Sequence, residues 1–423
     1  MHLLKSLLAT LGLILVTTAL PWQTHSNSSI LDLSRRTRIG GGHGAAEDTG
    51  SITDLFLLHD GKSSCLDRKD TLDHWLREAR ALHEAMKKAY ADAPTDPYTI
   101  GAFQTWFAQR FQVTQQPNEN PIIHLEPHRW AEIGARINRV SAFLSGGGVD
   151  DPQVPGEKPR LFCGPDAFEY QPWGSATRDH NGKEVWLKGQ DKPLPIDDTF
   201  FFMKVNGISV FWVDTFNGYD FSRKRATTIC PPTDGKGGVT LARTSKHPSD
   251  ILQQEPVKMG RSNRHIVFCP PIFDPVPGKA HTYESLAKAV SLENYPPPAT
   301  PGATDNDPRF NLDRMMPISS TLYHELYHLV DTGNDDSIDQ EYDLDNIINA
   351  AANDILPDKY INPVTGQQSI TLEEWQDNNV KNPETYAFLA MSFYLRYNAP
   401  EGKKPVIYTG PQPQLYVEMW GPH

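Results

Sequence analysis

The chain of 423 residues is 38% hydrophobic and 22% charged, so it can bury the core of at least one large domain and is not broadly disordered. Its 40 lysines and arginines and 52 aspartates and glutamates give a net charge of −12. This balance argues against a general binder of nucleic acid or of anionic membranes, because both kinds of partner require a basic surface.

The first 19 residues have the pattern of a secretory signal peptide. Lys5 is followed by an apolar stretch over residues 7–16 and by small residues at 17–19. That stretch is too short to span a bilayer and no later one is long enough, so we predict a secreted, extracellular protein without a membrane span. Residues 20–50 predict a flexible linker or a short propeptide, with Arg35 and Arg36 as a candidate processing site.

Helical and strand-like patterns follow one another along the rest of the chain. Helical spacing of apolar residues predicts helices at 66–90, around 103–111 and around 130–143, the last ended by three glycines at 146–148. Strand-like runs then occur at 184–188, 200–205, 208–213, 238–243 and 265–269, with Asn206-Gly207 as a predicted hairpin turn. Beyond a loop rich in proline and glycine at 270–310, helices are predicted at about 316–330, 343–354, 371–380 and 383–397. This order predicts an α+β fold.

Four cysteines occur in the compartment that a signal peptide implies, which is oxidising. They are Cys65, Cys163, Cys230 and Cys269. Their spacing fits no compact metal-binding pattern, so we predict two disulfides, for which the residues alone leave three connectivities open.

The most informative pattern is His324-Glu325-Leu326-Tyr327-His328, which has the form H-E-x-x-H. Positions i and i+4 of a helix share one face, so both imidazoles can meet one metal ion. The flanking apolar residues predict a largely buried helix, where two histidines and a glutamate are costly unless they are paired or coordinated. We therefore predict a Zn²⁺ site with His324 and His328 as ligands and Glu325 close enough to activate a water molecule.

A catalytic zinc site also needs a third protein ligand and an open position. The downstream carboxylates are the candidates: Asp331, Asp335, Asp336, Asp339, Glu341, Asp343, Glu373, Glu374 and Glu384. The metzincin pattern fails, because no third histidine follows Gly333 at a short spacing. A glutamate on a later helix, as in thermolysin-like enzymes, stays open.

Several segments resemble the aspzincins, a family that comprises the deuterolysins and the fungal peptidyl-lysine metalloendopeptidases. The specific segments are H-E-x-x-H and residues 337–342, Ser-Ile-Asp-Gln-Glu-Tyr, which are similar to the family's T-x-D-x-x-Y core. Less specific similarities are Ser64-Cys65, Tyr98-Thr99 with Trp106-Phe107, the strand and cysteine at 266–270, and Asn382 to Ala387. The resemblance covers about 64–145 and 260–397. Asp336-Ser337 and Asp343 depart from the family's glycines and threonine.

The resemblance implies a role for each residue of the core segments. His324, His328 and Asp339 would be the zinc ligands. Glu325 would be the general base that takes the proton of water and passes it to the leaving amine. Tyr342 would donate a hydrogen bond to the developing oxyanion.

The resemblance further implies the pairs Cys65–Cys163 and Cys230–Cys269, and it places Glu384 where lysine-specific members carry an acidic specificity residue. The implied fold is a mainly helical, zincin-like catalytic domain over residues 51–423, with a small antiparallel sheet and a β-rich insertion at about 146–260. The implied activity is hydrolysis of protein or peptide substrates by a secreted monomer, with lysine or another basic residue favoured on the leaving-group side.

Each of these assignments has a plainer alternative. Asp339 lies in an acidic run, and in the alternative this run is simply solvated or binds calcium. The alternative role of Tyr342 is packing alone. Asn382, Pro383 and Glu384 also fit an N-cap, a first-turn proline and an acid near the helix dipole. For the whole protein, the alternative is a catalytically impaired zincin-fold protein, secreted as a binding or effector-like protein.

Overall fold

The computed structural model describes most of the chain beyond the predicted linker. The described residues are 50–114, 122–149, 158–222, 226–231, 240–245, 264–274, 283–298, 307–331, 341–361, 368–408 and 414–415. They all belong to one unit that spans residues 43–423. The predicted signal peptide and almost all of the predicted linker or propeptide lie outside the described residues, so both stay predictions.

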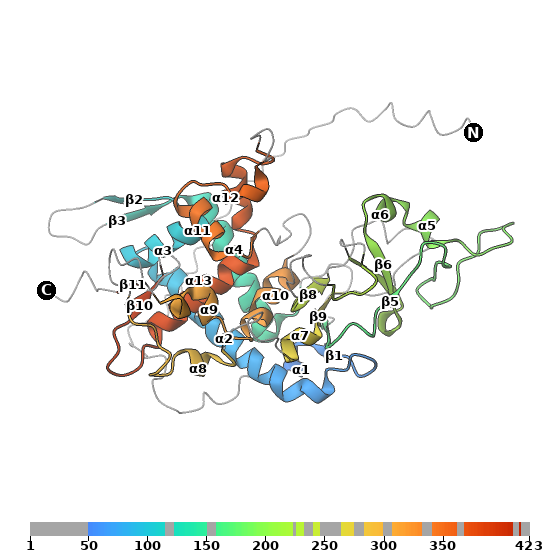
Figure 1. The fold of residues 1–423 in the computed structure, drawn as a ribbon, viewed down its shortest axis with the longest axis horizontal. Helices are drawn as coiled ribbons and strands as arrows, with labels where there is room; N and C mark the ends of the chain where they lie inside the picture. Colours follow the sequence, from blue (N-terminus) through green and yellow to red (C-terminus); the bar gives the residue numbers. More distant parts are fainter. Residues whose placement is uncertain are drawn as a thin grey trace, which may run out of the picture. The chain divides into compact units, whose positions relative to one another are not determined.

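The longer helices confirm the helical patterns of the sequence, except that the second helix ends at Phe107 and Phe111 begins a strand. They are α2 (Lys69–Asp92), α3 (Pro97–Phe107), α4 (Pro127–Ala142), α10 (Ser320–Val330), α11 (Leu344–Ala352), α12 (Leu372–Asn379) and α13 (Pro383–Tyr397) (Figure 1). The short helices are α1 (Ile52–Leu55), α5 (Ile196–Thr199), α6 (Phe201–Val205), α7 (Pro270–Phe273), α8 (Leu286–Ala289) and α9 (Leu312–Met315). A π-helical turn, Phe143–Gly147, follows α4. Its Gly146 takes φ 86°, outside the helical region, and Gly148 caps its end, where the glycine run predicts the end of the helix.

The helices share one large apolar core. α2 packs against α13, α10 and α4, so the helix of the H-E-x-x-H motif lies between helices on one side and the central sheet on the other. All residues of α10 are buried. Burial of this kind holds a helix in place through packing, since its own hydrogen bonds contribute little net stability.

The central sheet is mixed, which corrects the prediction of a small antiparallel sheet. Its strand order is β1 (Leu57–Leu58), β4 (Arg160–Phe162), β9 (His265–Phe268) and β8 (Ala242–Ser245). The pairs β1–β4 and β4–β9 are parallel, and only β8–β9 is antiparallel. Parallel neighbours require long crossovers, and α2 to α4 supply the one between β1 and β4. Because that crossover spans about a hundred residues of chain, the sequence pattern of the strands did not reveal it.

The remaining strands form small antiparallel pairs and one three-stranded sheet. They are β2 (Phe111–Thr114) with β3 (Ile122–Leu125), β10 (Val406–Ile407) with β11 (Gln414–Leu415), and β5 (Glu169–Tyr170), β6 (Ser209–Val213) and β7 (Gly218–Ser222) in one sheet. These pairs agree with the antiparallel part of the prediction. Asn217, with φ 44°, ends the turn between β6 and β7.

Three local predictions in this region were wrong. The run 184–188 forms no strand and contributes only an isolated bridge between Arg178 and Glu184. The run 200–205 forms the short helix α6 rather than a strand, and Asn206-Gly207 ends that helix rather than turning a hairpin. The amide of Ile208 donates to Met203 O at 2.9 Å, and Gly207 takes φ 69°, as a helix end requires. A short apolar run cannot be assigned to a strand or a helix by periodicity alone.

The region of the predicted insertion contributes both to the central sheet and to cores of its own. β4 and β8 are strands of the central sheet, although both lie within residues 146–260. Between them, β5 to β7 pack around two smaller apolar clusters, one of which includes Phe200, Trp212 and Tyr219. The other cluster includes Phe162 of β4 and Val267 of β9, so the region between β4 and β8 packs against the central sheet.

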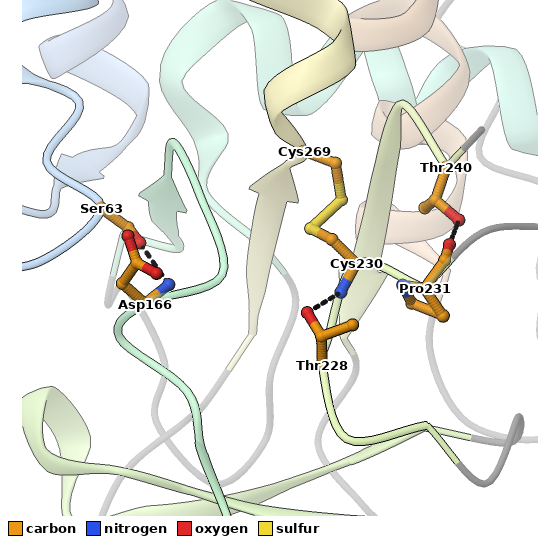
Figure 2. The surroundings of a disulfide bond; sticks show 7 residues. All are labelled: Ser63, Asp166, Thr228, Cys230, Pro231, Thr240 and Cys269. Atoms are coloured by element: carbon orange, nitrogen blue, oxygen red, sulfur yellow. Dashed lines mark hydrogen bonds between the residues drawn. A yellow bond between two sulfur atoms is a disulfide. The ribbon is translucent and has the colours of Figure 1, made fainter.

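Both disulfides have the pairing that the resemblance implies, Cys65–Cys163 and Cys230–Cys269. Figure 2 shows the second, which joins the segment 226–231 to the residue that follows β9. Beside it, the amide of Cys230 donates to Thr228 Oγ1, and Thr240 Oγ1 donates to Pro231 O just before β8 begins (Figure 2). The disulfide and these bonds fix the entry to β8.

A chain of polar groups lies under α10. His83 Nε2 contacts Ser141 Oγ at 2.6 Å, His83 Nδ1 contacts Tyr323 Oη at 3.3 Å, and Tyr323 Oη contacts Tyr327 Oη at 2.9 Å. His83 is 2% exposed. Its burial, helped by the charge of Lys87, lowers its pKa to about 3, so the imidazole is neutral in the folded protein at neutral pH.

This buried histidine predicts a loss of stability in mild acid. The unfolded chain binds a proton at the ordinary pKa of about 6.5 and the folded chain does not, so stability falls as the pH drops below that value. We expect His83 to account for about 2 kcal/mol of unfolding free energy lost between pH 7 and pH 5. Urea unfolding at both pH values checks this, with His83→Gln as the comparison. Equal losses in the two proteins contradict the prediction.

Candidate metal centre

Helix α10 presents the H-E-x-x-H residues from within the molecule. His324, Glu325 and His328 are 6%, 4% and 8% exposed. The two imidazole rings lie on one face with their centroids 5.0 Å apart. α10 packs against β8 and β9 (Figure 1), so the motif faces the edge of the central sheet. The sequence-based expectation that these two histidines lie together on a buried helix is confirmed.

The orientation of His324 is set by a carboxylate from α13. Glu384 Oε2 lies 2.7 Å from His324 Nδ1 and is largely buried. A carboxylate at Nδ1 favours the tautomer that carries its proton there, which puts the lone pair on Nε2. Histidines that coordinate metals are commonly held in this way by a second residue.

The length of this contact distinguishes a hydrogen bond from shared coordination. Two ligand atoms about 2.05 Å from a tetrahedral zinc are about 3.3 Å apart. The 2.7 Å between Glu384 Oε2 and His324 Nδ1 is instead the length of a charge-assisted hydrogen bond. Glu384 is therefore placed as a residue that positions His324, and its predicted contact with substrate stays a prediction.

The start of α13 differs from the plain capping alternative. Asn382 occupies the N-cap position and Pro383 the first turn, but the Asn382 side chain makes no capping bond. Its amide donates instead to Glu341 O at 2.9 Å and to Thr385 Oγ1 at 3.1 Å. Asn382 thus ties the segment that begins at Glu341 to the helix that carries Glu384.

If Glu384 orients a metal ligand, its charge matters for metal affinity. We expect Glu384→Gln to weaken zinc binding about 10- to 100-fold, as for other carboxylates that support a ligating histidine. Competition against a chromophoric chelator measures this. Glu373→Gln is the matched control, because Glu373 is also a glutamate in the first turn of a helix but is exposed. If the two variants bind zinc with equal affinity, Glu384 does not support the metal site and acts only as a charge at the start of the helix.

The carboxylate of Glu325 has a partner on the edge strand. Thr244 Oγ1 lies 2.6 Å from Glu325 Oε2 and 3.2 Å from Glu325 O. Thr244 is on β8, the edge strand of the central sheet within the described residues. The predicted general base is therefore held by a hydroxyl from an element about 80 residues away in sequence.

Tyr342 lies beside the first histidine of the motif. Its ring centroid is 5.9 Å from that of His324, with 16° between the ring planes, and the residue is 56% exposed. The structure thus brings together five of the predicted site residues: His324, Glu325, His328, Tyr342 and Glu384. The role of Tyr342 as an oxyanion donor stays a prediction.

The predicted third ligand, Asp339, lies outside the described residues, which resume at Glu341. Among the described residues, no group of three or more histidine, cysteine, aspartate or glutamate side chains is arranged to hold a metal ion. Zinc coordination by Asp339 therefore stays a prediction, as does the glutamate alternative. Of the other candidates, Glu373 and Glu374 are exposed on α12.

The residues on both sides of segment 332–340 are anchored by buried charges. Before it, Asp331 is fully buried and forms an ion pair with the fully buried Arg136, while Arg139 lies 3.7 Å from its other oxygen. Arg264 also donates to Leu329 O at 3.0 Å near the end of α10. Asp331 was a candidate third ligand, but its carboxylate is already engaged by the side chains of Arg136 and Arg139.

After the segment, Glu341 is the organising residue and is 5% exposed. Its carboxylate accepts from the amides of Tyr342 and Asp343 at 3.0 and 3.1 Å. Lys359 Nζ lies 3.0 Å away and Asn346 Nδ2 donates at 3.2 Å. Glu341 is thus engaged in holding Tyr342 beside the histidines.

Sequence reasoning missed the supporting residues Thr244, Arg136 and Asn382 as parts of the site. Thr244 reaches Glu325 of the motif, whereas Arg136 reaches Asp331 before segment 332–340 and Asn382 reaches Glu341 after it. The sequence singled out Asn382 only through the resemblance and as an N-cap. A single threonine in a strand-like run gives no signal that its hydroxyl meets the carboxylate of Glu325. Only the packing of α10 against β8 and α4 reveals the connection.

Comparison with known proteins identifies no family for this chain. No family model matches it, and no solved structure matches it. A protein named "Non-secreted LysM effector LysM17", from Penicillium expansum, is 35% identical over 127 residues, which are 28% of this chain and 16% of that protein. The chain thus spans about a sixth of the length of this relative. Among the described residues, no helix has the length and apolarity needed to cross a membrane.

Proposed function

We propose that the protein is a zinc-dependent endopeptidase of the aspzincin type. The observation that carries the proposal is the buried H-E-x-x-H helix, in which the two imidazoles lie together and one is oriented by a carboxylate. The donor set suits Zn²⁺, which accepts imidazole nitrogen and carboxylate oxygen. His324 and His328 would hold the ion, with Asp339 as the proposed third ligand.

The residues around this site can then divide the chemistry among them. A zinc ion bound there supplies Lewis-acid activation of water and of the substrate carbonyl. Glu325 accepts the proton of water at its carboxylate and later delivers it to the leaving amine. Tyr342, exposed beside His324, donates a hydrogen bond to the oxygen on which negative charge develops.

The edge strand β8 supports a peptide as the substrate class. The amide of Cys269 donates to Leu241 O, and β8 and β9 pair Ala242 with Phe268 and Thr244 with Ile266. Hydrogen-bonded pairs alternate in an antiparallel ladder, so the backbone groups of Ala242 and Thr244 point to the outer edge. An extended peptide can add to such an edge through its own backbone. The same strand contacts the motif through Thr244.

The secreted location is part of the proposal. Two disulfides fit an oxidising compartment outside the cytosol, and the predicted signal peptide agrees with them. The partial relative carries "non-secreted" in its name, so the location requires a direct test. The preference for lysine rests on Glu384, whose carboxylate is bonded to His324, and has no geometric support of its own. The monomeric state rests on the sequence alone.

The alternative is an effector-like binding protein that retains the scaffold without turnover. It is favoured by the name of the partial relative, an effector. In that case the histidines would keep a structural metal and the β5–β7 region would be the interaction surface.

One experiment separates the two functions. The purified protein is loaded with zinc, its metal content is measured, and it is incubated with casein and with a peptide library, with and without a zinc chelator. Bound zinc with chelator-sensitive cleavage supports the peptidase. Bound zinc without cleavage favours the effector-like protein, and failure to bind zinc overturns the metal site.

A further inference from the structure

Strand β8 directs alternate side chains to two different neighbours. Thr244 points to α10, where its hydroxyl meets Glu325. Arg243 and Ser245, one residue to either side, point to the opposite face, where both reach Asp220 on β7. This is the alternation expected of a strand, and it places Thr244 between a catalytic helix and a buried polar cluster.

That polar cluster fixes β8 firmly. Asp220 is 1% exposed; it accepts from Ser245 Oγ at 2.6 Å and lies 3.3 Å from His265 Nε2 on β9. Arg243 also donates to Phe221 O at 2.6 Å. Burial alone would raise the pKa of Asp220, but Arg243 and His265 hold it well below its usual range, so the carboxylate stays charged. Displacing β8 would remove Arg243 and Ser245 from the buried charge of Asp220, so this charge holds the strand in place.

The hydroxyl of Thr244 has one proton and two acceptors within reach. Glu325 Oε2 is at 2.6 Å and Glu325 O is at 3.2 Å. The shorter contact to an ionised carboxylate is the stronger one, so the proton goes to Oε2. Because Glu325 has several rotatable bonds, this bond selects one direction for its carboxylate.

We propose that Thr244 is a positioning residue, which holds the Glu325 carboxylate in the direction that proton transfer requires. The inference rests on the proposed peptidase function. It also gives the region between β4 and β8 a role: β7 anchors β8 through Asp220, and β8 in turn aims Thr244 at Glu325. With Oε2 held by Thr244, Oε1 is the oxygen that accepts the proton of water.

Three threonine variants test the inference. Thr244→Val keeps the shape and removes the hydroxyl, and Thr244→Ser restores the hydroxyl. Thr240→Val is the matched control, because Thr240 precedes the same strand and its hydroxyl donates to Pro231 O instead (Figure 2). We expect Thr244→Val to lower kcat about 10- to 100-fold with little change in KM and no change in zinc content. Thr244→Ser and Thr240→Val should stay within a few-fold of the unchanged protein.

Crystal structures of the same variants give a readout that does not depend on activity. Thr244→Val should show the Glu325 carboxylate displaced, with β8 in place, and Thr244→Ser should show it restored. An active protein whose Thr244→Val variant keeps its kcat and its carboxylate position overturns the inference and leaves the peptidase standing. A displaced carboxylate in a protein that cleaves nothing shows that Thr244 fixes the position of Glu325, but it refutes the peptidase and with it the role of Thr244 in proton transfer. An undisplaced carboxylate overturns the positioning role in either case.

Discussion

Glu325→Gln should abolish most peptide hydrolysis while the protein keeps its zinc. The amide has the size of the carboxylate and can still accept from Thr244, so the geometry of the site is preserved. It cannot accept a proton from water, however, and loss of a general base of this kind costs about 10²- to 10⁴-fold in rate. kcat/KM on an unfolded protein substrate and zinc stoichiometry, measured on the same preparations, check the expectation.

The control for this variant is Glu401→Gln, which makes the same chemical change in an exposed turn. It should behave as the unchanged protein in both measurements. Equal activity in Glu325→Gln would refute the assignment of the base. Loss of zinc together with activity would instead show that Glu325 serves the metal site as a structural residue.

Asp331→Ala should strongly destabilise the fold. Asp331 and Arg136 are both fully buried and paired, and the aspartate ends the helix that carries the histidines. Removing one partner of a buried ion pair removes the counter-charge of the other and costs about 3–5 kcal/mol. Urea unfolding at neutral pH, followed by circular dichroism, measures the loss.

A double variant distinguishes this cause from simple cavity formation. Arg136→Met/Asp331→Ala removes both charges of the pair. Replacing a buried ion pair by apolar residues often leaves the stability unchanged. The double variant should therefore recover much of the loss. If it is as unstable as the sum of the two single variants, the ion pair is not the reason for the destabilisation.

The sequence predicted the local elements well where their patterns are long. The periodicity of apolar residues located α2, α4 and α10 to α13 within a few residues, since each helix buries a continuous face. It misassigned 200–205, where six residues are too few for a period, and it did not show that β1 and β4 run parallel. Strand direction depends on the path of the chain between strands, which no local pattern records.

The sequence by itself determined the motif residues of the site: a spacing of four places His324 and His328 on one helical face wherever that helix lies. Only the tertiary structure decided what surrounds them. Glu384 reaches His324 from α13, Thr244 reaches Glu325 from β8, and Arg136 pairs with Asp331 from α4. The physical reason is that helical geometry is a property of neighbouring residues, whereas hydrogen bonds and ion pairs between elements exist only after the core has packed those elements together.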